Sequence, residues 1–208
     1  MAKNNKDERE KMKRLLTILA TVSAFTLPFG VHAEGGYLGA SFGSTEVDFG
    51  QLTVGAGTTL DDEDSGYKIY GGYNLNENFA LEGGYVDFGE STLTAPTGAQ
   101  FTLAGVLLQA TTDINVTASS DAFTFAGVGK MDVGIGNIFG KLGLAMWDSE
   151  TTSNIAVLNG SDDGTDLFFG FGIDIGVTEA LVARFEYEMY ELDDDEVDMM
   201  SLGLHVAF

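Results

Sequence analysis

The charged side chains with the most suggestive spacing lie in residues 181–191, Leu-Val-Ala-Arg-Phe-Glu-Tyr-Glu-Met-Tyr-Glu. Arg184, Glu186 and Glu188 occupy every second position, and apolar residues such as Phe185 alternate with them. Alternate side chains of a β-strand point to opposite faces, whereas the helical period would scatter these charges around the circumference. The pattern therefore predicts a strand with one apolar face and one charged face, on which ion pairs can form.

The basic residues beyond position 33 all share this charged face. These four residues, each of which alternates with apolar side chains in its segment, are Lys68, Lys130, Lys141 and Arg184. The acids at equivalent positions are Glu82, Asp132, Asp174, Glu186 and Glu188. A charge on the lipid face of a membrane barrel costs about 2–4 kcal/mol near the bilayer midplane, whereas a charge inside the barrel can pair. We expect a lumenal ion-pair cluster that is structural, with a switchable gate as the alternative.

Seven further segments repeat the alternation of residues 181–191. They are residues 36–48, 66–75, 79–89, 122–133, 138–148, 166–177 and 197–208. Their lengths near ten residues match a tilted β-span of the hydrocarbon core, and no apolar run beyond position 33 is long enough for a transmembrane helix. Eight such strands predict an all-β fold, an eight-stranded antiparallel up-and-down transmembrane β-barrel. A water-soluble sandwich would bury the same apolar faces.

The connections favour the membrane barrel over the sandwich. Short connections rich in Asn and Gly are predicted at residues 74–78, 134–137 and 178–180. Longer ones are predicted at residues 49–64, 90–121 and 149–165, with a shorter one at 192–196. Short turns at one rim and long loops at the other are typical of outer-membrane barrels. Side chains just fill the interior of eight strands, so the charges should plug the lumen rather than line a wide pore.

The first 33 residues have the features of a secretory signal. Residues 15–29 form a mostly apolar run after the basic stretch 11–14, and Val31-His32-Ala33 provides the small residues of a cleavage site. We expect a signal peptide over residues 1–33, with Met12 as an alternative start, and secretion through the inner membrane.

The predicted barrel domain, residues 34–208, is strongly acidic, with 29 acidic residues against four basic ones. Such a chain should not bind nucleic acid. The absence of cysteine excludes a disulfide scaffold and a lipid anchor on cysteine. We expect a monomer in the bacterial outer membrane, in contact with its lipids and lipopolysaccharide.

Three runs of acidic residues lie in the predicted long-loop rim. They are Asp61, Asp62, Glu63 and Asp64; Asp162, Asp163 and Asp166; and Asp193, Asp194, Asp195 and Glu196. Clustered carboxylates can bind Ca²⁺ or Mg²⁺, and such ions could bridge to lipopolysaccharide phosphates. No run has the spacing of a known calcium loop, so a solvated acidic rim is the favoured interpretation. We expect no cofactor.

An enzymatic function would need a nucleophile close to a base. The one histidine beyond position 33, His205, shares a face with Ser201, but four residues of strand separate them by roughly 13 Å. We therefore expect no enzyme, and a lumenal histidine packed among acids.

Four segments together resemble the OmpA-like transmembrane domain family. Residues 68–85 resemble its second hairpin, 140–147 its fifth strand, and 183–187 and 200–208 its seventh and eighth strands. The resemblance covers about residues 35–208. It implies an interior ion-pair set at Glu82, Lys130, Asp174 and Arg184, with Asp174 replacing a longer Glu, and a terminal Phe208 read by the barrel-assembly machinery.

The resemblance implies an envelope-integrity role, with at most a narrow gated diffusion path. Two features depart from the long members of the family. The chain ends at the barrel, so the function of a peptidoglycan-binding periplasmic domain is not expected. The loop at 90–121 is long and largely uncharged, and residues 106–108 are expected to extend strands above the membrane. The alternative function is an adhesin or receptor-type binding module that uses the loops at 90–121 and 150–165.

Overall fold

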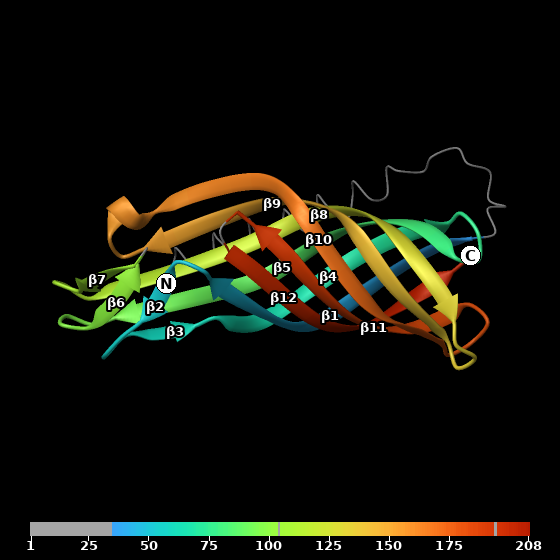
Figure 1. Ribbon diagram of the computed structural model, residues 1–208, viewed down its shortest axis with the longest axis horizontal. Coiled ribbons are helices and arrows are strands. Elements are labelled where there is room, and N and C mark those ends of the chain that lie inside the picture. The colour runs from blue at the N-terminus through green and yellow to red at the C-terminus, as the bar shows by residue number, and fades with distance from the viewer. Residues whose placement is uncertain (1–34, 104, 194) are drawn as a thin grey trace, which may run out of the picture. The chain divides into compact units, whose positions relative to one another are not determined.

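The computed structural model describes residues 35–103, 105–193 and 195–208, so the predicted signal peptide and Asp194 lie outside the described residues. Eight long strands form an antiparallel barrel (Figure 1). They are β1 (Gly36–Phe49), β4 (Glu63–Asn74), β5 (Phe79–Ala95), β8 (Ile114–Asp132), β9 (Asn137–Ser153), β10 (Gly160–Gly176), β11 (Leu181–Leu192) and β12 (Asp195–Ala207). Pairing of β1 with β12 closes the barrel. The predicted all-β fold and the predicted transmembrane barrel type are confirmed.

Strands continue into segments that were predicted as long loops. β5, β8, β9 and β10 all extend beyond their predicted outer ends. Short strands β2 (Leu52–Val54), β6 (Gln100–Leu103) and β7 (Val106–Gln109) form a separate three-stranded sheet, and β3 (Thr59–Asp61) pairs with β5. Residues 106–108 form a strand as expected, but strand β7 belongs to this separate sheet and does not extend a barrel strand. The loop predictions were too long because polar and β-branched residues on both faces form ladders there without an apolar alternation.

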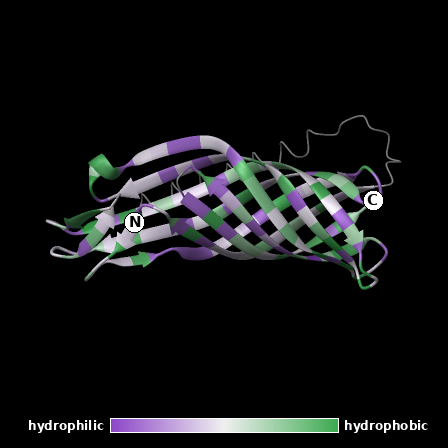
Figure 2. Ribbon diagram, in the orientation of Figure 1, coloured by the Kyte–Doolittle hydropathy of each residue, from purple (hydrophilic) through white to green (hydrophobic). Residues whose placement is uncertain are grey.

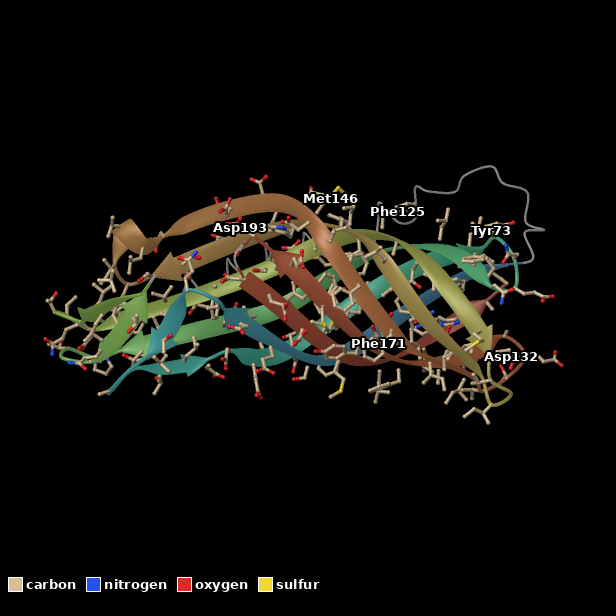
Figure 3. All side chains as sticks on the ribbon, viewed as in Figure 1. Tyr73, Phe125, Asp132, Met146, Phe171 and Asp193 are labelled. Atoms are coloured by element: carbon tan, nitrogen blue, oxygen red, sulfur yellow. The ribbon has the colours of Figure 1, made fainter. Side chains whose placement is uncertain are left out.

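The outward face of the barrel is apolar. Phe125, Met146, Phe171 and Leu202 expose 52–67% of their surface, and Figure 3 shows the first three around the outside of the barrel. Figure 2 shows the alternation of hydrophobic and hydrophilic residues along the strands. This exposed band is the lipid-facing surface expected of a transmembrane β-barrel. Among the described residues, no helix is long and apolar enough to cross a membrane, and the single 3₁₀ turn η1 spans Ala156–Leu158.

The short turns lie where the sequence predicted them. Asn76 Oδ1 accepts hydrogen bonds from the backbone N–H groups of Asn78 and Phe79 at 2.9 Å. Thr178 Oγ1 accepts from the N–H groups of Ala180 and Leu181. These Asx- and ST-type turns join consecutive strands at the end of the barrel that holds Phe208 (Figure 1).

The barrel has its core in the lumen, in two apolar layers. The outer layer, toward the long hairpins, contains Val86, Phe88, Ala122, Ala126, Ala145, Trp147, Phe168, Tyr190, Leu192, Val197 and Met199. The inner layer, toward the short turns, contains Tyr37, Tyr70, Ala80, Val128 and Phe139. Phe168 and Tyr190 stack with their ring planes 7° apart in the outer layer. The two layers leave a polar zone between them.

Candidate functional site: a buried ion-pair network in the lumen

Arg184 is held in the polar zone by two carboxylates from different strands. Its Nε and Nη2 donate to the two oxygens of Asp174 at 2.8 and 2.9 Å, in a bidentate pair. Its Nη1 donates to Glu82 Oε2 at 2.6 Å. The guanidinium lies over the rings of Phe139 and Tyr70, with its Cζ 4.4 and 4.8 Å from their centroids. The Arg184 side chain has no exposed surface.

Two lysines complete the network toward the outer layer. Lys68 pairs with Glu186 and with Glu188 Oε2, the latter at 2.5 Å. Lys141 pairs with Glu186 Oε1 at 2.7 Å, with Glu188 Oε1 at 2.5 Å and with Glu82 Oε1 at 3.2 Å. Since Glu82 contacts both Lys141 and Arg184, all seven charges form one connected network. We call Lys68, Lys141, Arg184, Glu82, Asp174, Glu186 and Glu188 the lumenal network.

The lumenal network contains four carboxylates and three cations, and tyrosines help to satisfy the additional acid. Tyr37 donates from its hydroxyl to Glu82 Oε2 at 2.8 Å, and Tyr190 donates to Glu188 Oε1 at 2.9 Å. Buried charges are tolerated when they are paired and hydrogen-bonded. Because Tyr37 belongs to the inner layer and Tyr190 to the outer layer, the network is tied to the apolar layers on both sides.

Glycines on the inward face make room for these long side chains. A Cβ added to Gly172 would lie 2.2 Å from the backbone oxygen of Phe185 and 2.6 Å from the ring of Phe139. A Cβ at Gly170 would lie 3.0 Å from side-chain carbons of both Lys141 and Glu188. Strand β10 therefore needs glycine where it passes the lumenal network.

Two of the predicted lumenal residues do not join the network. Lys130 donates to Asn74 Oδ1 at 2.9 Å and lies over the Tyr37 ring, and no salt bridge links it to a carboxylate among the described residues. Its inclusion in the ion-pair set was wrong, because it lies one layer closer to the short turns. Asp132 is exposed and accepts a hydrogen bond from the Gly134 N–H in the turn.

For Lys68 and Lys141, the sequence identified the interior acids that were available as partners but not which acid each lysine contacts. Glu188 was recognised as an interior acid, but its central place between Lys68 and Lys141 was not predicted. Its alternation with Glu186 on the inward face of β11 was the available signal. Which strands meet at this level depends on the barrel stagger, which residue spacing does not give.

His205 and Ser201 lie in the lumen but do not approach a catalytic arrangement. His205 Nδ1 lies 3.3 Å from the Tyr70 hydroxyl, and its ring packs on Tyr37 at 5.1 Å between centroids. Its close contacts are with tyrosines, and the acids Asp174 and Glu82 act on it only electrostatically. The Ser201 hydroxyl is buried and has no hydrogen-bond partner among the described residues. Neither residue is placed as a nucleophile–base pair.

The acidic runs are spread over the outer rim. Asp64 Oδ2 accepts from the backbone N–H of Glu90 at 2.8 Å, which binds β4 to the bulge of β5. Asp61 ends β3, Asp62 follows it, and Asp193 forms the β11–β12 turn with a positive φ of 59°. Among the described residues, no three carboxylate or histidine side chains are grouped so that they could hold a metal ion.

Outside the membrane-spanning part, one carboxylate has a clear structural role. Asp113 accepts hydrogen bonds at 2.8 Å from both the backbone N–H and the hydroxyl of Thr97. These donors hold the pKa of Asp113 below its ordinary value, the backbone N–H having the larger effect. The contact joins the segment before β6 to the segment before β8.

Phe208 occupies the expected position at the end of the last strand. Its backbone N–H donates to the oxygen of Gly36 at 2.8 Å, and its ring is 70% exposed. It therefore combines a paired backbone with an outward-facing aromatic side chain.

Comparisons with known proteins agree with this geometry. The model of the family described as outer membrane protein beta-barrel domain matches residues 15–208. No curated protein matches the chain.

Two solved structures are similar to this chain at low sequence identity, and the first of them shows the same fold. The attachment invasion locus protein Ail of Yersinia pestis is 19% identical, with a TM-score of 0.51 over 84% of this chain and 99% of Ail. The Pseudomonas aeruginosa OprF N-terminal barrel is 15% identical, with a TM-score of 0.45 over 84% of this chain and 98% of that one. Because the family model matches residues 15–208, the chain belongs to the outer membrane protein β-barrel domain family.

Proposed function

We propose that this protein is a structural component of the bacterial outer membrane whose lumen is closed by the lumenal network. The observation that carries this proposal is the burial of the network between two apolar layers. Lys68, Arg184, Glu186 and Glu188 are at most 1% exposed. A water-filled path would hydrate charges at this level, and the interior of an eight-stranded barrel has little room beyond its own side chains.

The proposal is tested in the cell that makes the protein. Loss of the protein should sensitise the cells to detergent and to bulky antibiotics that an intact outer membrane excludes. The wild-type barrel should restore resistance. A variant without residues 97–112, which removes β6 and β7 but leaves the eight barrel strands, should also restore it. Unchanged sensitivity on loss of the protein would contradict the structural role.

A second candidate function is surface binding through the long hairpins. The observation that favours it is the ordered β-structure beyond the membrane band, including the β2–β6–β7 sheet with Leu107 66% and Val106 58% exposed. The structurally similar protein Ail is described as an attachment invasion locus protein. An adhesive role requires that cells carrying the variant without residues 97–112 lose attachment to host cells while they retain detergent resistance.

We also propose that the protein is exported with a cleaved signal and inserted by the barrel-assembly machinery. The support is the sequence of residues 1–33, membership of the outer-membrane family, and the exposed terminal ring of Phe208. Protein from the outer-membrane fraction should have the intact mass of a chain that begins at Glu34. Deletion of Phe208 should lower the inserted amount. Retention of residues 15–29 or undiminished insertion, respectively, would refute these two expectations.

A further inference from the structure

Two adjoining cavities occupy the outer end of the barrel, beyond the outer apolar layer. The inner chamber has a volume of about 230 Å³ and the outer chamber about 510 Å³. Both are lined by Phe49, Ser91, Ala118, Thr151 and Asp195. Together they form a space in the size range of small-molecule sites, separated from the lumenal network by the outer layer.

The inner chamber combines an apolar floor with acidic walls. Phe88, Trp147, Leu192 and Val197 of the outer layer form its floor. The indole N–H of Trp147 donates to Asp166 Oδ2 at 2.8 Å, which fixes the orientation of the ring. Three aspartates also line this chamber, namely Asp162, Asp193 and Asp195.

The outer chamber is mainly apolar. Its lining includes side chains from six different strands: Leu52, Leu60, Leu93, Phe101, Leu108 and Ile114. Figure 2 shows hydrophobic segments at this end of the barrel, on β2, β3 and β7. Apolar surface that enters such a space leaves water, which favours binding.

The charged residues around the chambers favour a positively charged ligand over a negatively charged one. Neither lining contains a lysine, an arginine or a histidine. Of the described basic residues, Lys68, Lys141 and Arg184 belong to the lumenal network, and Lys130 lies beyond it toward the short turns. The charged side chains that line the chambers are all carboxylates, so they would repel an anionic amphiphile. A cation would be attracted to these carboxylates and to the faces of the aromatic rings in the floor.

On one side of the inner chamber, the barrel wall extends less far from the membrane than on the other sides. Residues 160–167 of β10 pair with β9, but pairing with β11 begins only at Phe168 and Tyr190. The β11–β12 connection therefore lies closer to the membrane-spanning part than the tips of the other hairpins, and Figure 3 shows Asp193 to the right of those tips, toward the middle of the barrel. The acidic residues at this connection lie where a ligand can pass from outside.

We propose that the outer end of the barrel binds a hydrophobic organic cation. Its apolar body occupies the outer chamber, and its positive charge lies beside Asp162, Asp193 and Asp195, above Trp147 and Phe88. This binding function is independent of the structural role, since the site lies outside the closed lumen.

Fluorescence of Trp147 provides a direct test, because the chain contains one tryptophan. The folded protein in phosphatidylcholine nanodiscs is titrated with hexyltrimethylammonium, which has its charge at one end of an apolar chain, and the same titration with hexanesulfonate supplies an anion with the same chain. Empty nanodiscs correct for partition into lipid. We expect a saturable change in Trp147 emission with the cation and none with the anion. Equal responses to both ions, or no saturable response to the cation, would overturn the proposal.

Two variants test the position of the site. Asp162→Asn together with Asp195→Asn should weaken cation binding about fivefold or more, because two attractive charges are lost. The matched control, Asp61→Asn with Asp62→Asn, removes two charges that line neither chamber and should weaken binding much less. Ala118→Leu should also weaken binding, since Ala118 lines both chambers.

Folding of each variant is checked by its mobility in unheated SDS gels before titration. Equal affinity of the folded chamber variants and of the control pair would place the cation elsewhere and refute the proposed site. If the doubly substituted variant does not fold, the Ala118→Leu result decides alone, since unchanged affinity there also refutes the site.

Discussion

Arg184 is the residue on which the lumenal network depends most. It binds Glu82 and Asp174 at once, and its guanidinium lies over the rings of Tyr70 and Phe139. Removal of one partner from a buried pair leaves an uncompensated charge, and this accounts for the large cost of such substitutions. The same side chain on the lipid face would have no partner, which is why the strand has Arg184 at an inward-facing position.

Arg184→Ala should lower the free energy of unfolding by about 3–5 kcal/mol. Lys130→Ala is the matched control, since it also removes one lumenal cation but breaks no salt bridge, only a hydrogen bond to Asn74 and the contact with the Tyr37 ring. We expect the control to cost about 1 kcal/mol. Urea unfolding of both variants from lipid vesicles measures the difference. Equal small losses would show that water hydrates the charges of the lumen, since exposed pairs contribute only about 0–1 kcal/mol.

A pH effect is expected at Asp113, outside the membrane. Because its pKa is lowered in the folded protein, the Thr97–Asp113 contact is fully stabilising above the ordinary Asp pKa of about 3.9. This contribution is lost as the pH falls through the lowered value. Thr97→Ala removes the hydroxyl donor but keeps the backbone N–H, so the pKa of Asp113 should rise only part of the way. Carboxyl ¹³C titration measures this pKa, and an unshifted titration in the variant would argue against the side-chain contact.

At the scale of the elements, the strands in the membrane were predictable because one face of each strand must be apolar toward lipid, whereas the other can carry polar and charged residues toward the lumen. All eight predicted segments correspond to strands, and tight turns such as 178–180 lie as expected. Outside the membrane this contrast disappears, so the continuation of β8 and β9 over residues 114–121 and 149–153 was not visible in the sequence. Strand β7 was anticipated because residues 106–108 are apolar within a polar loop.

Strand β10 shows how an element is adapted to the side chains that fill the lumen. Gly172→Ala should destabilise the barrel by about 1–3 kcal/mol, as overpacking does, because the new methyl group would meet the Phe185 backbone and the Phe139 ring. Gly140→Ala is the control on the lipid face, where the nearest atom lies 3.9 Å from the added carbon. That substitution should be neutral or slightly stabilising. Thermal unfolding of the two variants gives the comparison, and equal stabilities would mean that β10 can shift to make room.

At the scale of the whole molecule, closure of the barrel determines which charges meet. Alternation alone placed nine charged residues inside, and seven of them form the network, whereas Lys130 and Asp132 do not. Their pairing was only partly predictable, since Lys68 and Glu186 are 118 residues apart and meet only through the stagger of the closed barrel. The chambers at the outer end could not be predicted, because side chains from many separate segments form them.

The central claim is that the lumenal network and its two apolar layers close the barrel. The most direct test is the single-channel conductance of the purified wild-type protein in a planar lipid bilayer. Insertion is verified independently by protease protection of the membrane-embedded strands. The closed lumen predicts inserted barrels that show no conductance steps above the leak of the bilayer. Steady, ohmic steps from the folded wild-type protein would contradict the claim and show an open water path past Arg184.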